Sequence, residues 1–478
     1  MSEDGGLCPE GWVTRRLKGW HLYHCPELRV AEILATNGRR VGWFLGIGVA
    51  QDGSLFPSGA RLPVAADDTT FWSVAESMIE GVAGRYAAIL SDGREERIYH
   101  DPVCDLSCVF DPTSRIVAST LLLCLHRPLV RNRRMPHRGP LKGKHNYALQ
   151  QTADRYVKRA LPNHYLSLRT FAPVRHFPRA DEVFEADEAQ LDIICERIAE
   201  RLKQVTTTLL TNFDCVLPVT GGNDSRNLLA CAAGVLGQTQ TVLFTHHINK
   251  MSGFDCMIGQ QIASVLGQDV QVIDVTDPVH QDQFQPDAVR RLRWDVGYAT
   301  GYQTLEPGNG VAMAVQLAPA GQCLLRWNVM ELMRANQYPR GDAAGFNLKH
   351  GLSKLRVAPE IDSTAEAVWG PDYMMWVDTL PENAKFKIYD FAFVEQLLPN
   401  TMGGTLWGPV PQFYINPFSD RGMIAAALSM PAPIRRRNRI NRRIVDLTCP
   451  ALNDIPRTNA FKKDPDNHTS YELLFART

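Results

Sequence analysis

The feature that most constrains this sequence is a glycine-rich stretch that joins an apolar run to a helical pattern. The apolar run, Cys215-Val216-Leu217-Pro218-Val219, has the length and composition of a buried strand, although proline is uncommon inside a central strand. It leads directly into Thr220-Gly221-Gly222-Asn223-Asp224-Ser225-Arg226, and a helical pattern covers residues 227–233. A strand that passes through Gly-Gly into a helix is typical of the first unit of a parallel α/β sheet.

The residue types in this stretch favour anion binding. Gly221 and Gly222 have no side chain, so their backbone N–H groups can approach a phosphate closely, and the N-terminus of the following helix adds positive partial charge. Thr220 and Ser225 contribute hydroxyl groups, and Asp224 has an oxygen that can hold the magnesium ion of a nucleotide. The stretch therefore predicts a phosphate-binding loop, and a tight turn capped by Asp-Ser is the structural alternative.

Alternating apolar and helical patterns surround the loop. An amphipathic helix is predicted before it, because apolar residues recur at steps of three and four at Leu191, Ile194, Ile198, Leu202, Val205 and Leu209. After it, strands are predicted at residues 241–245 and 270–274, with a helix between them at residues 255–266. We expect a parallel sheet with extra helices, because the pattern beyond about residue 285 is mainly helical.

The first 175 residues have a different pattern, made of short β-rich runs separated by Asp-Gly, Asp-Pro and Pro-Ser turns. These runs are residues 41–45, 85–90, 96–99 and 115–119. They predict an antiparallel sandwich, and a charged stretch at residues 179–188 separates it from the rest. The expected fold is thus α/β and α+β in two domains, residues 1–180 and 181–478, which suits a chain of 478 residues.

Composition limits the classes of partner. The formal net charge is +0, with 51 basic and 51 acidic residues, so no overall field attracts nucleic acid or an anionic membrane. Eleven cysteines without a Cys-x-x-Cys pair predict neither a disulfide framework nor a zinc site. The acidic start and the lack of a long apolar run predict a soluble, cytoplasmic protein without a membrane partner, and a homo-oligomer is a further option.

Three segments together resemble a known family. Residues 219–226 resemble the PP-loop of the N-type ATP pyrophosphatases, specifically the synthetase domain of the asparagine synthetase family, which includes β-lactam synthetase and lasso-peptide cyclases. Residues 326–335, Arg-Trp-Asn-Val-Met-Glu-Leu-Met-Arg-Ala, are similar to the family segment that supplies an acidic magnesium ligand. Residues 415–421, Ile-Asn-Pro-Phe-Ser-Asp-Arg, are similar to its Pro-Phe-x-Asp segment. The resemblance spans about residues 190 to 460.

The resemblance implies a set of site residues, with ATP and Mg²⁺ as cofactors. The residues implied to bind the nucleotide are Thr220, Gly221, Gly222, Asp224, Ser225, Arg226, Phe244 and Thr245. Asp224 and Glu331 would hold the metal. Catalytic roles fall on Glu331, on Arg334, which can clamp a carboxylate or phosphate, and on Lys462 or Lys463, where the family has a mobile lysine. The alternative for Glu331 and for the two lysines is a solvated surface position.

The N-terminal part is similar to the glutaminase-like, Ntn-hydrolase-like half of asparagine synthetases, at residues 84–87, 99–102 and 117–119. A glutaminase of that family needs an N-terminal cysteine as its nucleophile, whereas Ser2 stands here and the nearest cysteine is Cys8. The acidic stretch after Ser2 is expected to be flexible and to give it no fixed position. We therefore expect a degenerate domain without glutaminase activity.

The combined expectation is an ATP-dependent amide ligase. It would adenylate a small-molecule or peptide carboxylate with release of pyrophosphate, and an amine would then displace AMP, in the biosynthesis of a specialised metabolite or a modified glycan. Two alternatives stay open. One is a PP-loop enzyme that adenylates a nucleobase or another carbonyl, as in transfer-RNA modification, and the other is a non-catalytic nucleotide-binding paralogue.

Overall fold

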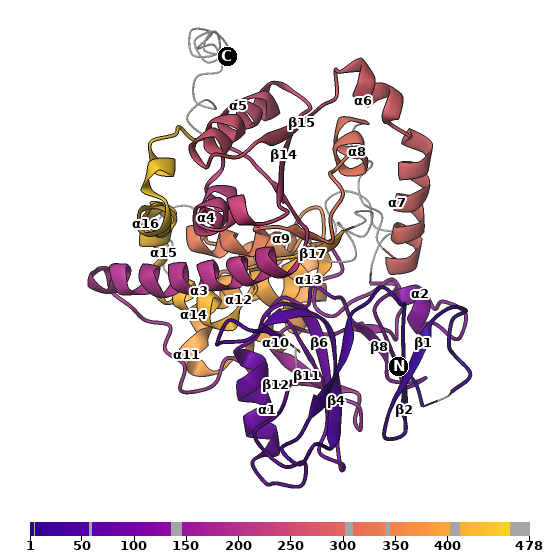
Figure 1. The fold of residues 1–478 in the computed structure, drawn as a ribbon. Helices are drawn as coiled ribbons and strands as arrows, with labels where there is room; N and C mark the ends of the chain where they lie inside the picture. The colour runs from indigo at the N-terminus through magenta and orange to yellow at the C-terminus, as the bar shows by residue number, and fades with distance from the viewer. Residues whose placement is uncertain are drawn as a thin grey trace.

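The computed structural model describes residues 1–3, 5–56, 60–134, 146–301, 309–339, 345–401 and 412–458. Within these residues the chain forms an antiparallel sheet in its N-terminal part and a separate, all-parallel sheet in its C-terminal part (Figure 1). This mixture of an antiparallel and a parallel α/β architecture confirms the coarse fold expected from the sequence.

The antiparallel sheet has seven strands in the order β12-β11-β7-β6-β4-β3, and β5 pairs with β4. The strands are β3 Val30–Leu34, β4 Arg40–Val49, β5 Leu55–Phe56, β6 Ala83–Ser91, β7 Glu96–His100, β11 His164–Ser167 and β12 Ala172–Arg175. Helix α1, Phe71–Glu80, covers one face of this sheet, where Phe44, Tyr86 and Tyr99 are fully buried. Alternate residues of the same strands therefore point to the opposite face.

Two small sheets pack on that opposite face. They are the hairpin β1 Val13–Leu17 with β2 Trp20–His24, and the sheet β8 Val109–Asp111, β9 Ile116–Ala118 and β10 Lys158–Arg159. A second cluster of buried side chains, among them Trp20, Trp43 and Phe110, fills the space between the layers. A short helix, α2 Leu121–Cys124, follows β9. The four β-rich runs predicted from the sequence lie in β4, β6, β7 and β9.

The parallel sheet has the order β15-β14-β13-β16-β17. Its strands are β13 Cys215–Pro218, β14 Val242–His247, β15 Val270–Asp274, β16 Cys323–Leu325 and β17 Phe413–Ile415. Three of them match predicted strands, and Pro218 is tolerated because it is the last residue of β13. The mainly helical expectation beyond residue 285 overlooked β16 and β17, which have three residues each and are too short to show a periodicity.

Helices cover both faces of the parallel sheet. On one face Leu217, Leu243 and Leu325 pack in the main core with α3 Leu191–Asn212, α4 Asn223–Ala232 and α5 Lys250–Val265. On the other face Val216 and Phe244 form a smaller cluster, against which residues next to α8, Asn309–Gln316, are packed. Successive side chains of a strand point to opposite faces of the sheet, so neighbouring residues pack against different helix layers.

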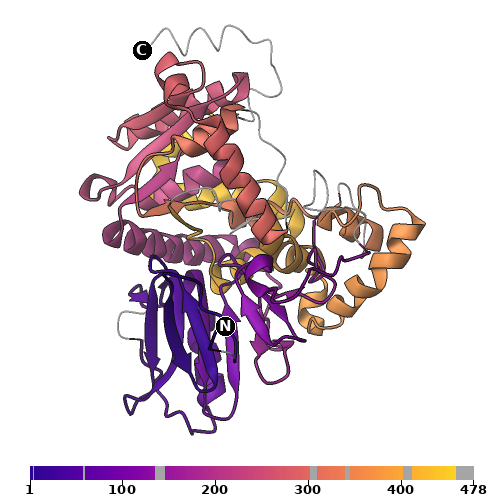
Figure 2. The same cartoon turned by 90° about the vertical axis from the view of Figure 1, so that its right-hand side faces the viewer.

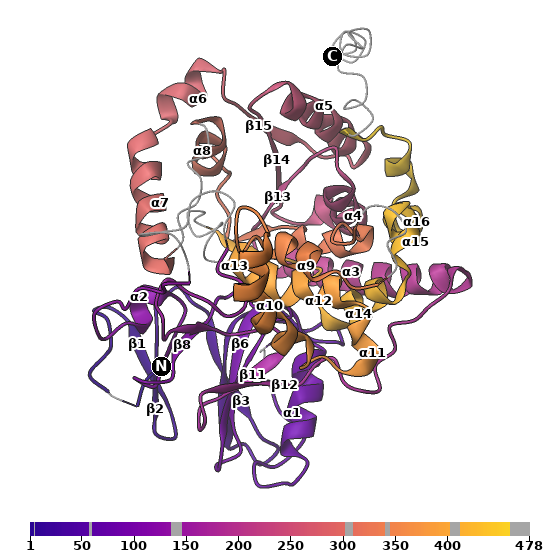
Figure 3. The same ribbon diagram turned by 180° about the vertical axis from the view of Figure 1, so that it is seen from behind.

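The remaining helices lie mostly in the second half of the chain. They are α6 Pro278–Gln283, α7 Pro286–Thr300, α9 Leu348–Leu355, α10 Ser363–Val377, α11 Glu382–Lys385, α12 Ile388–Ala392, α13 Leu398–Thr401, α14 Arg421–Ser429, α15 Ala432–Arg436 and α16 Arg439–Thr448. Short turns of other helix types are η1 Glu188–Gln190, η2 Leu236–Gln238, η3 Asn328–Arg334, η4 Phe393–Leu397 and η5 Pro450–Asn453. Figure 2 shows the helices of residues 345–401 projecting to one side, in orange, and Figure 3 shows α16 beside α4.

A buried polar junction joins the two sheets. The Arg421 guanidinium, which is 2% exposed, donates to Asn163 and to the backbone carbonyl of His100. The Gly84 N–H donates to the Ser419 carbonyl at 2.9 Å, so the segment after β17 is fixed to the antiparallel sheet. The main hydrophobic core also runs through this junction, because it includes residues of β4, α3 and the parallel sheet. Among the described residues, no helix combines the length and apolar character that crossing a membrane requires.

Candidate active site at the parallel-sheet switch point

The strand order of the parallel sheet reverses direction between β13 and β16. From β13 the chain builds outward to β14 and β15, and it then returns to the other side of β13 to place β16 and β17. The carboxyl ends of β13 and β16 therefore define a topological switch point, which is where open α/β sheets bind their ligands. The glycine loop follows β13, and η3 follows β16, so residues about 110 positions apart meet there.

The glycine loop has the strand–loop–helix geometry that the sequence predicted. The Val219 N–H donates to the Phe244 carbonyl at 2.7 Å, which continues the β13–β14 ladder up to the loop. Helix α4 begins at Asn223, with extended Gly222 as its N-cap residue. The hydroxyl groups of Thr220 and Ser225 lie 2.9 Å apart and close the loop across its base. The N-terminus of α4 thus lies at the switch point of the sheet, and helix N-termini can bind phosphate.

Asp224 lies in the first turn of α4 and is 8% exposed. Its Oδ2 accepts a hydrogen bond from Arg334 Nη2 at 2.6 Å. Its Oδ1 is buried and has no hydrogen-bond partner among the described residues. Burial raises the pKa of Asp224 to about 6; nearby Arg334 opposes this rise and Glu331 adds to it. A buried carboxylate oxygen without a partner is costly, so this atom is available for a ligand that the fold does not supply.

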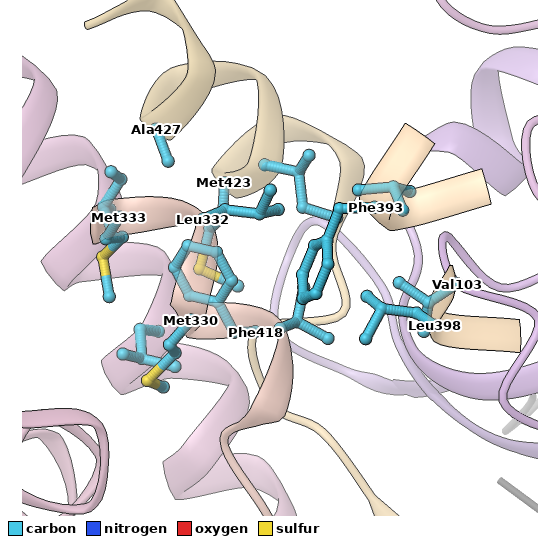
Figure 4. Close-up of a cluster of buried hydrophobic side chains, with 14 of the residues drawn as sticks. Val103, Met330, Leu332, Met333, Phe393, Leu398, Phe418, Met423 and Ala427 are labelled. Atoms are coloured by element: carbon cyan, nitrogen blue, oxygen red, sulfur yellow. The ribbon is translucent and has the colours of Figure 1, made fainter. Parts of the chain in front are cut away.

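The short helix η3 presents Glu331 and Arg334 to Asp224. Its apolar residues Met330, Leu332 and Met333 are at most 1% exposed and anchor it in the main core. Figure 4 shows these three side chains in one cluster with Phe418, Met423 and Ala427. The core thus fixes η3 from one side, and the charged residues between the apolar ones lie on the side of the loop.

Glu331 is the second acidic group of the site. Burial raises the pKa of Glu331, and this rise is opposed by the positive charges of Arg334, Arg356 and Lys354. Its charge in turn raises the pKa of Asp224, so the two carboxyl groups are close enough to interact. Two carboxylates with nearby cations have the chemistry to hold a hard metal ion beside a polyanion. The structure therefore brings together the predicted residues Asp224, Glu331 and Arg334.

Arg226 has a different environment from the phosphate clamp that the sequence suggested. Its side chain is completely buried, and it donates to the backbone carbonyls of Leu452, Ile455 and Pro456 at 2.6 to 2.8 Å. Burial, with a contribution from Arg457, lowers the pKa of Arg226 to about 10. The guanidinium thus fastens the C-terminal segment to α4, and these bonds differ from the predicted contact with phosphate.

The same C-terminal segment reaches the glycine loop through contacts that the sequence did not reveal. Asp255, on α5, accepts hydrogen bonds from the Gly221 N–H at 2.9 Å and from the Thr458 hydroxyl. The Thr458 N–H donates to the Gly221 carbonyl, and Arg457 Nε donates to Asn223 at 2.6 Å. The contacts of Arg457 and Thr458 join residues more than 200 positions apart and have no local sequence signal, whereas Gly221 and Asp255 are 34 positions apart. The predicted catalytic lysines, Lys462 and Lys463, lie outside the described residues.

Phe244 and Thr245 lie in the middle of β14, which continues to His247, and Phe244 is hydrogen-bonded to Val219 at the base of the loop. Both are buried, and the Thr245 hydroxyl donates to the Cys256 thiol at 3.7 Å. Phe244 pairs in register with Pro218. The structure thus places the two residues on the strand next to the loop, with Phe244 contributing to the apolar cluster on one sheet face.

Ser2 differs from the flexible position expected from the sequence. It is 3% exposed, and its backbone exchanges two hydrogen bonds with His21, at 3.1 and 2.8 Å. The Met1 amino group donates to the Val117 carbonyl, and burial lowers its pKa to about 6. The start of the chain is therefore held against the small sheets, because the backbone of Ser2 forms an antiparallel bridge with His21 on the edge of β2 that does not pair with β1.

The eleven cysteines are all free thiols, in agreement with the expected lack of a disulfide framework. In the part of the chain that the structure describes, no group of three or more His, Cys, Asp or Glu side chains could hold a metal ion.

A scan against protein-family models finds no match for this chain, and a search of curated protein sequences finds none either.

Proposed function

We propose that the chain is an ATP-dependent ligase that adenylates a substrate carboxylate at the glycine loop and releases pyrophosphate. The observation that carries this proposal is the meeting of Asp224 with Glu331 and Arg334 at the switch point of the parallel sheet. A loop of this kind can bind phosphate on its own. The added pair of carboxylates and the arginine suit a triphosphate whose charge must be neutralised as pyrophosphate departs.

The donor set fits Mg²⁺ bound together with a nucleotide. Asp224 Oδ1 is an orphaned buried carboxylate oxygen, and Glu331 supplies a second carboxylate close to it. Mg²⁺ commonly takes one or two protein carboxylates and completes its octahedron with phosphate oxygens and water. When bound, the metal would neutralise the developing charge of the leaving pyrophosphate.

The protein's own residues would act on the reacting groups by position and charge. A carboxylate oxygen attacks the α-phosphorus of ATP, the bond from that phosphorus to the bridging oxygen breaks, and pyrophosphate leaves with the electron pair. An amine nitrogen then attacks the acyl carbon, the carbon–oxygen bond to AMP breaks, and the nitrogen loses a proton. The N-terminus of α4 would bind the phosphates, and Arg334 would offset negative charge in both steps.

The PP-loop and asparagine synthetase-like identity of the C-terminal part, and the degenerate glutaminase-like identity of the N-terminal part, belong to the same proposal. The strand–glycine loop–helix unit and the position of η3 support the first identity. The layered antiparallel sheets support the second. We propose that the amine comes from the acyl substrate itself or from a second small molecule, and not from glutamine.

Calorimetric titration of Mg·ATP tests the binding step. Wild type should bind Mg·ATP, and Asp224→Asn should weaken this binding by about tenfold or more, because an amide replaces a charged metal ligand. Arg290→Gln is a suitable control, since Arg290 pairs with exposed Asp287 on α7. Wild type that binds no nucleotide would contradict the proposal, and binding without any pyrophosphate release would favour the non-catalytic paralogue.

A further inference from the structure

The ion pair between Arg334 and Asp224 occupies Oδ2 of the carboxylate that the proposed function assigns to the metal, whereas Oδ1 has no hydrogen-bond partner among the described residues. Arg334 Nη2 lies 2.6 Å from Asp224 Oδ2, and the two side chains are 26% and 10% exposed. The pair is thus mostly shielded from water, where a charge-assisted hydrogen bond is stronger than on the surface. Any cation that binds Asp224 through the same oxygen must displace this guanidinium.

Arg334 does not hold its own segment in place through this bond. The apolar residues Val329, Met330, Leu332 and Met333 fix η3 in the core, and each is at most 1% exposed. The contrast with Arg226 is direct, because the three acceptors of Arg226 are backbone carbonyls of a segment that it ties down. Arg334 has a side-chain acceptor instead, so its bond can break without unfolding a segment.

The charges around the pair favour an exchange of cations. Asp224 and Glu331 both interact with Arg334, and Arg356 and Lys354 add positive charge near Glu331. Without a compensating cation, two neighbouring carboxylates that are shielded from water repel each other and are unstable as a charged pair. A divalent cation supplies the same compensation with twice the charge, but it is favoured only when phosphate oxygens complete its coordination.

We propose that Arg334 is a resident counter-ion that competes with Mg²⁺ for Asp224, and that metal bound to a nucleotide displaces it. This inference rests on the proposed nucleotide site. In the proposed exchange, Arg334 binds Asp224 when the site is empty. When metal and nucleotide bind, Arg334 leaves Asp224 and moves toward the bound phosphates. Metal without nucleotide then binds weakly, because it has to break the ion pair without gaining phosphate ligands.

Binding of Mn²⁺ to the nucleotide-free chain tests the exchange, since the free ion is counted directly by electron paramagnetic resonance. The comparison includes wild type, two neutral variants, Arg334→Gln and Arg334→Met, and the conservative Arg334→Lys, at mildly alkaline pH. Both neutral variants should bind Mn²⁺ about tenfold more tightly than wild type, because the competing cation is gone. Arg334→Lys should bind as weakly as wild type, and adding Asp224→Asn to Arg334→Gln should abolish the gain.

The result that would overturn the inference is Mn²⁺ binding that is unchanged or weaker in both neutral variants, with urea unfolding midpoints equal to that of wild type. A purely structural role of Arg334 predicts that outcome, since loss of structure does not tighten a metal site. Calorimetry with Mg·ATP on wild type separates the two proposals. If wild type binds Mg·ATP and the neutral variants gain no Mn²⁺ affinity, only the counter-ion inference fails. If they gain affinity while wild type binds no nucleotide, the proposed function fails and the competition stands.

Discussion

Two charged residues of the same helical turn, Asp224 and Arg226, have opposite roles in the structure. Arg226 is completely buried, and three main-chain carbonyls accept its hydrogen bonds. Asp224 has one exchangeable side-chain partner and one buried oxygen without a partner among the described residues. The Nη donors of Arg226 are bonded to the main chain, whereas Asp224 keeps a buried oxygen without a partner that our proposal assigns to a ligand. The two charges on the same loop thus differ in their partners, and we propose a structural role for Arg226 and a ligand-binding role for Asp224.

The largest effect on stability is expected on the Arg226 side. Arg226→Met keeps the apolar stem but removes the donors for three carbonyls, so we expect the free energy of unfolding to fall by about 3 kcal/mol or more. Urea unfolding followed by circular dichroism measures this change. Arg334→Met is the matched variant on the other side and should change stability by less than about 1 kcal/mol. An equal loss of unfolding free energy in Arg226→Met and Arg334→Met would contradict the proposed difference between the two arginines.

Alanine substitutions at the two glycines of the loop provide a second matched comparison, with a smaller expected effect on stability. A Cβ at Gly221 would lie 2.1 Å from the Thr458 hydroxyl and 2.7 Å from Ile258, whereas at Gly222 the nearest atom is the Thr220 hydroxyl at 3.5 Å. Gly221→Ala should therefore displace the C-terminal segment and destabilise the chain by about 1–3 kcal/mol. Gly222→Ala should stay within about 1 kcal/mol of wild type, because its φ of −77° suits alanine. Faster proteolysis near Thr458 in Gly221→Ala alone would locate the effect.

Asp224→Asn should raise the free energy of unfolding, whereas Arg226→Met should lower it. The pKa of Asp224 is raised from 3.8 to about 6 in the folded chain, chiefly by burial, so its ionisation disfavours the folded state. The contribution of the Asp224 carboxyl to the free energy of unfolding is therefore fully present below about pH 4. It is lost as the pH rises through about 6. The nucleotide-free Asn variant should be more stable than wild type by on the order of 2 kcal/mol above pH 6, with the difference vanishing below pH 4. Urea midpoints across this pH range measure it, and a variant less stable than wild type at high pH would contradict the account.

The sequence predicts the parts of the site that depend on local pattern. The apolar run, Gly-Gly and the following helical pattern indicated the loop, and β15 was predicted with its observed bounds, Val270–Asp274. Helix α4 begins at Asn223, earlier than the pattern at residues 227–233 suggested, because the polar residues of its first turn carry no apolar periodicity. The position of Glu331 came from the family resemblance, since a single acidic residue in an apolar segment has no signal of its own.

The parts that the sequence did not predict depend on contacts across long separations. The role of Arg226 is set by carbonyls at residues 452–456, and backbone acceptors leave no trace in residue identity. Asp255 and Thr458 meet at Gly221 only because α5 and the C-terminal segment both return to the loop. The fixed position of Ser2 depends on strand pairing with His21, which the acidic residues after it concealed. In each case a local pattern suggests the residue's chemistry, and the tertiary fold determines its partner.

Pyrophosphate release from Mg·ATP is the measurement that tests the central claim most directly. It is measured for wild type and Asp224→Asn across a panel of carboxylates, with and without amines. The account predicts release that requires a particular carboxylate, formation of an amide when an amine is present, and a rate at least about a hundredfold lower in Asp224→Asn. Release that needs no carboxylate, or an equal rate in the variant, would contradict it.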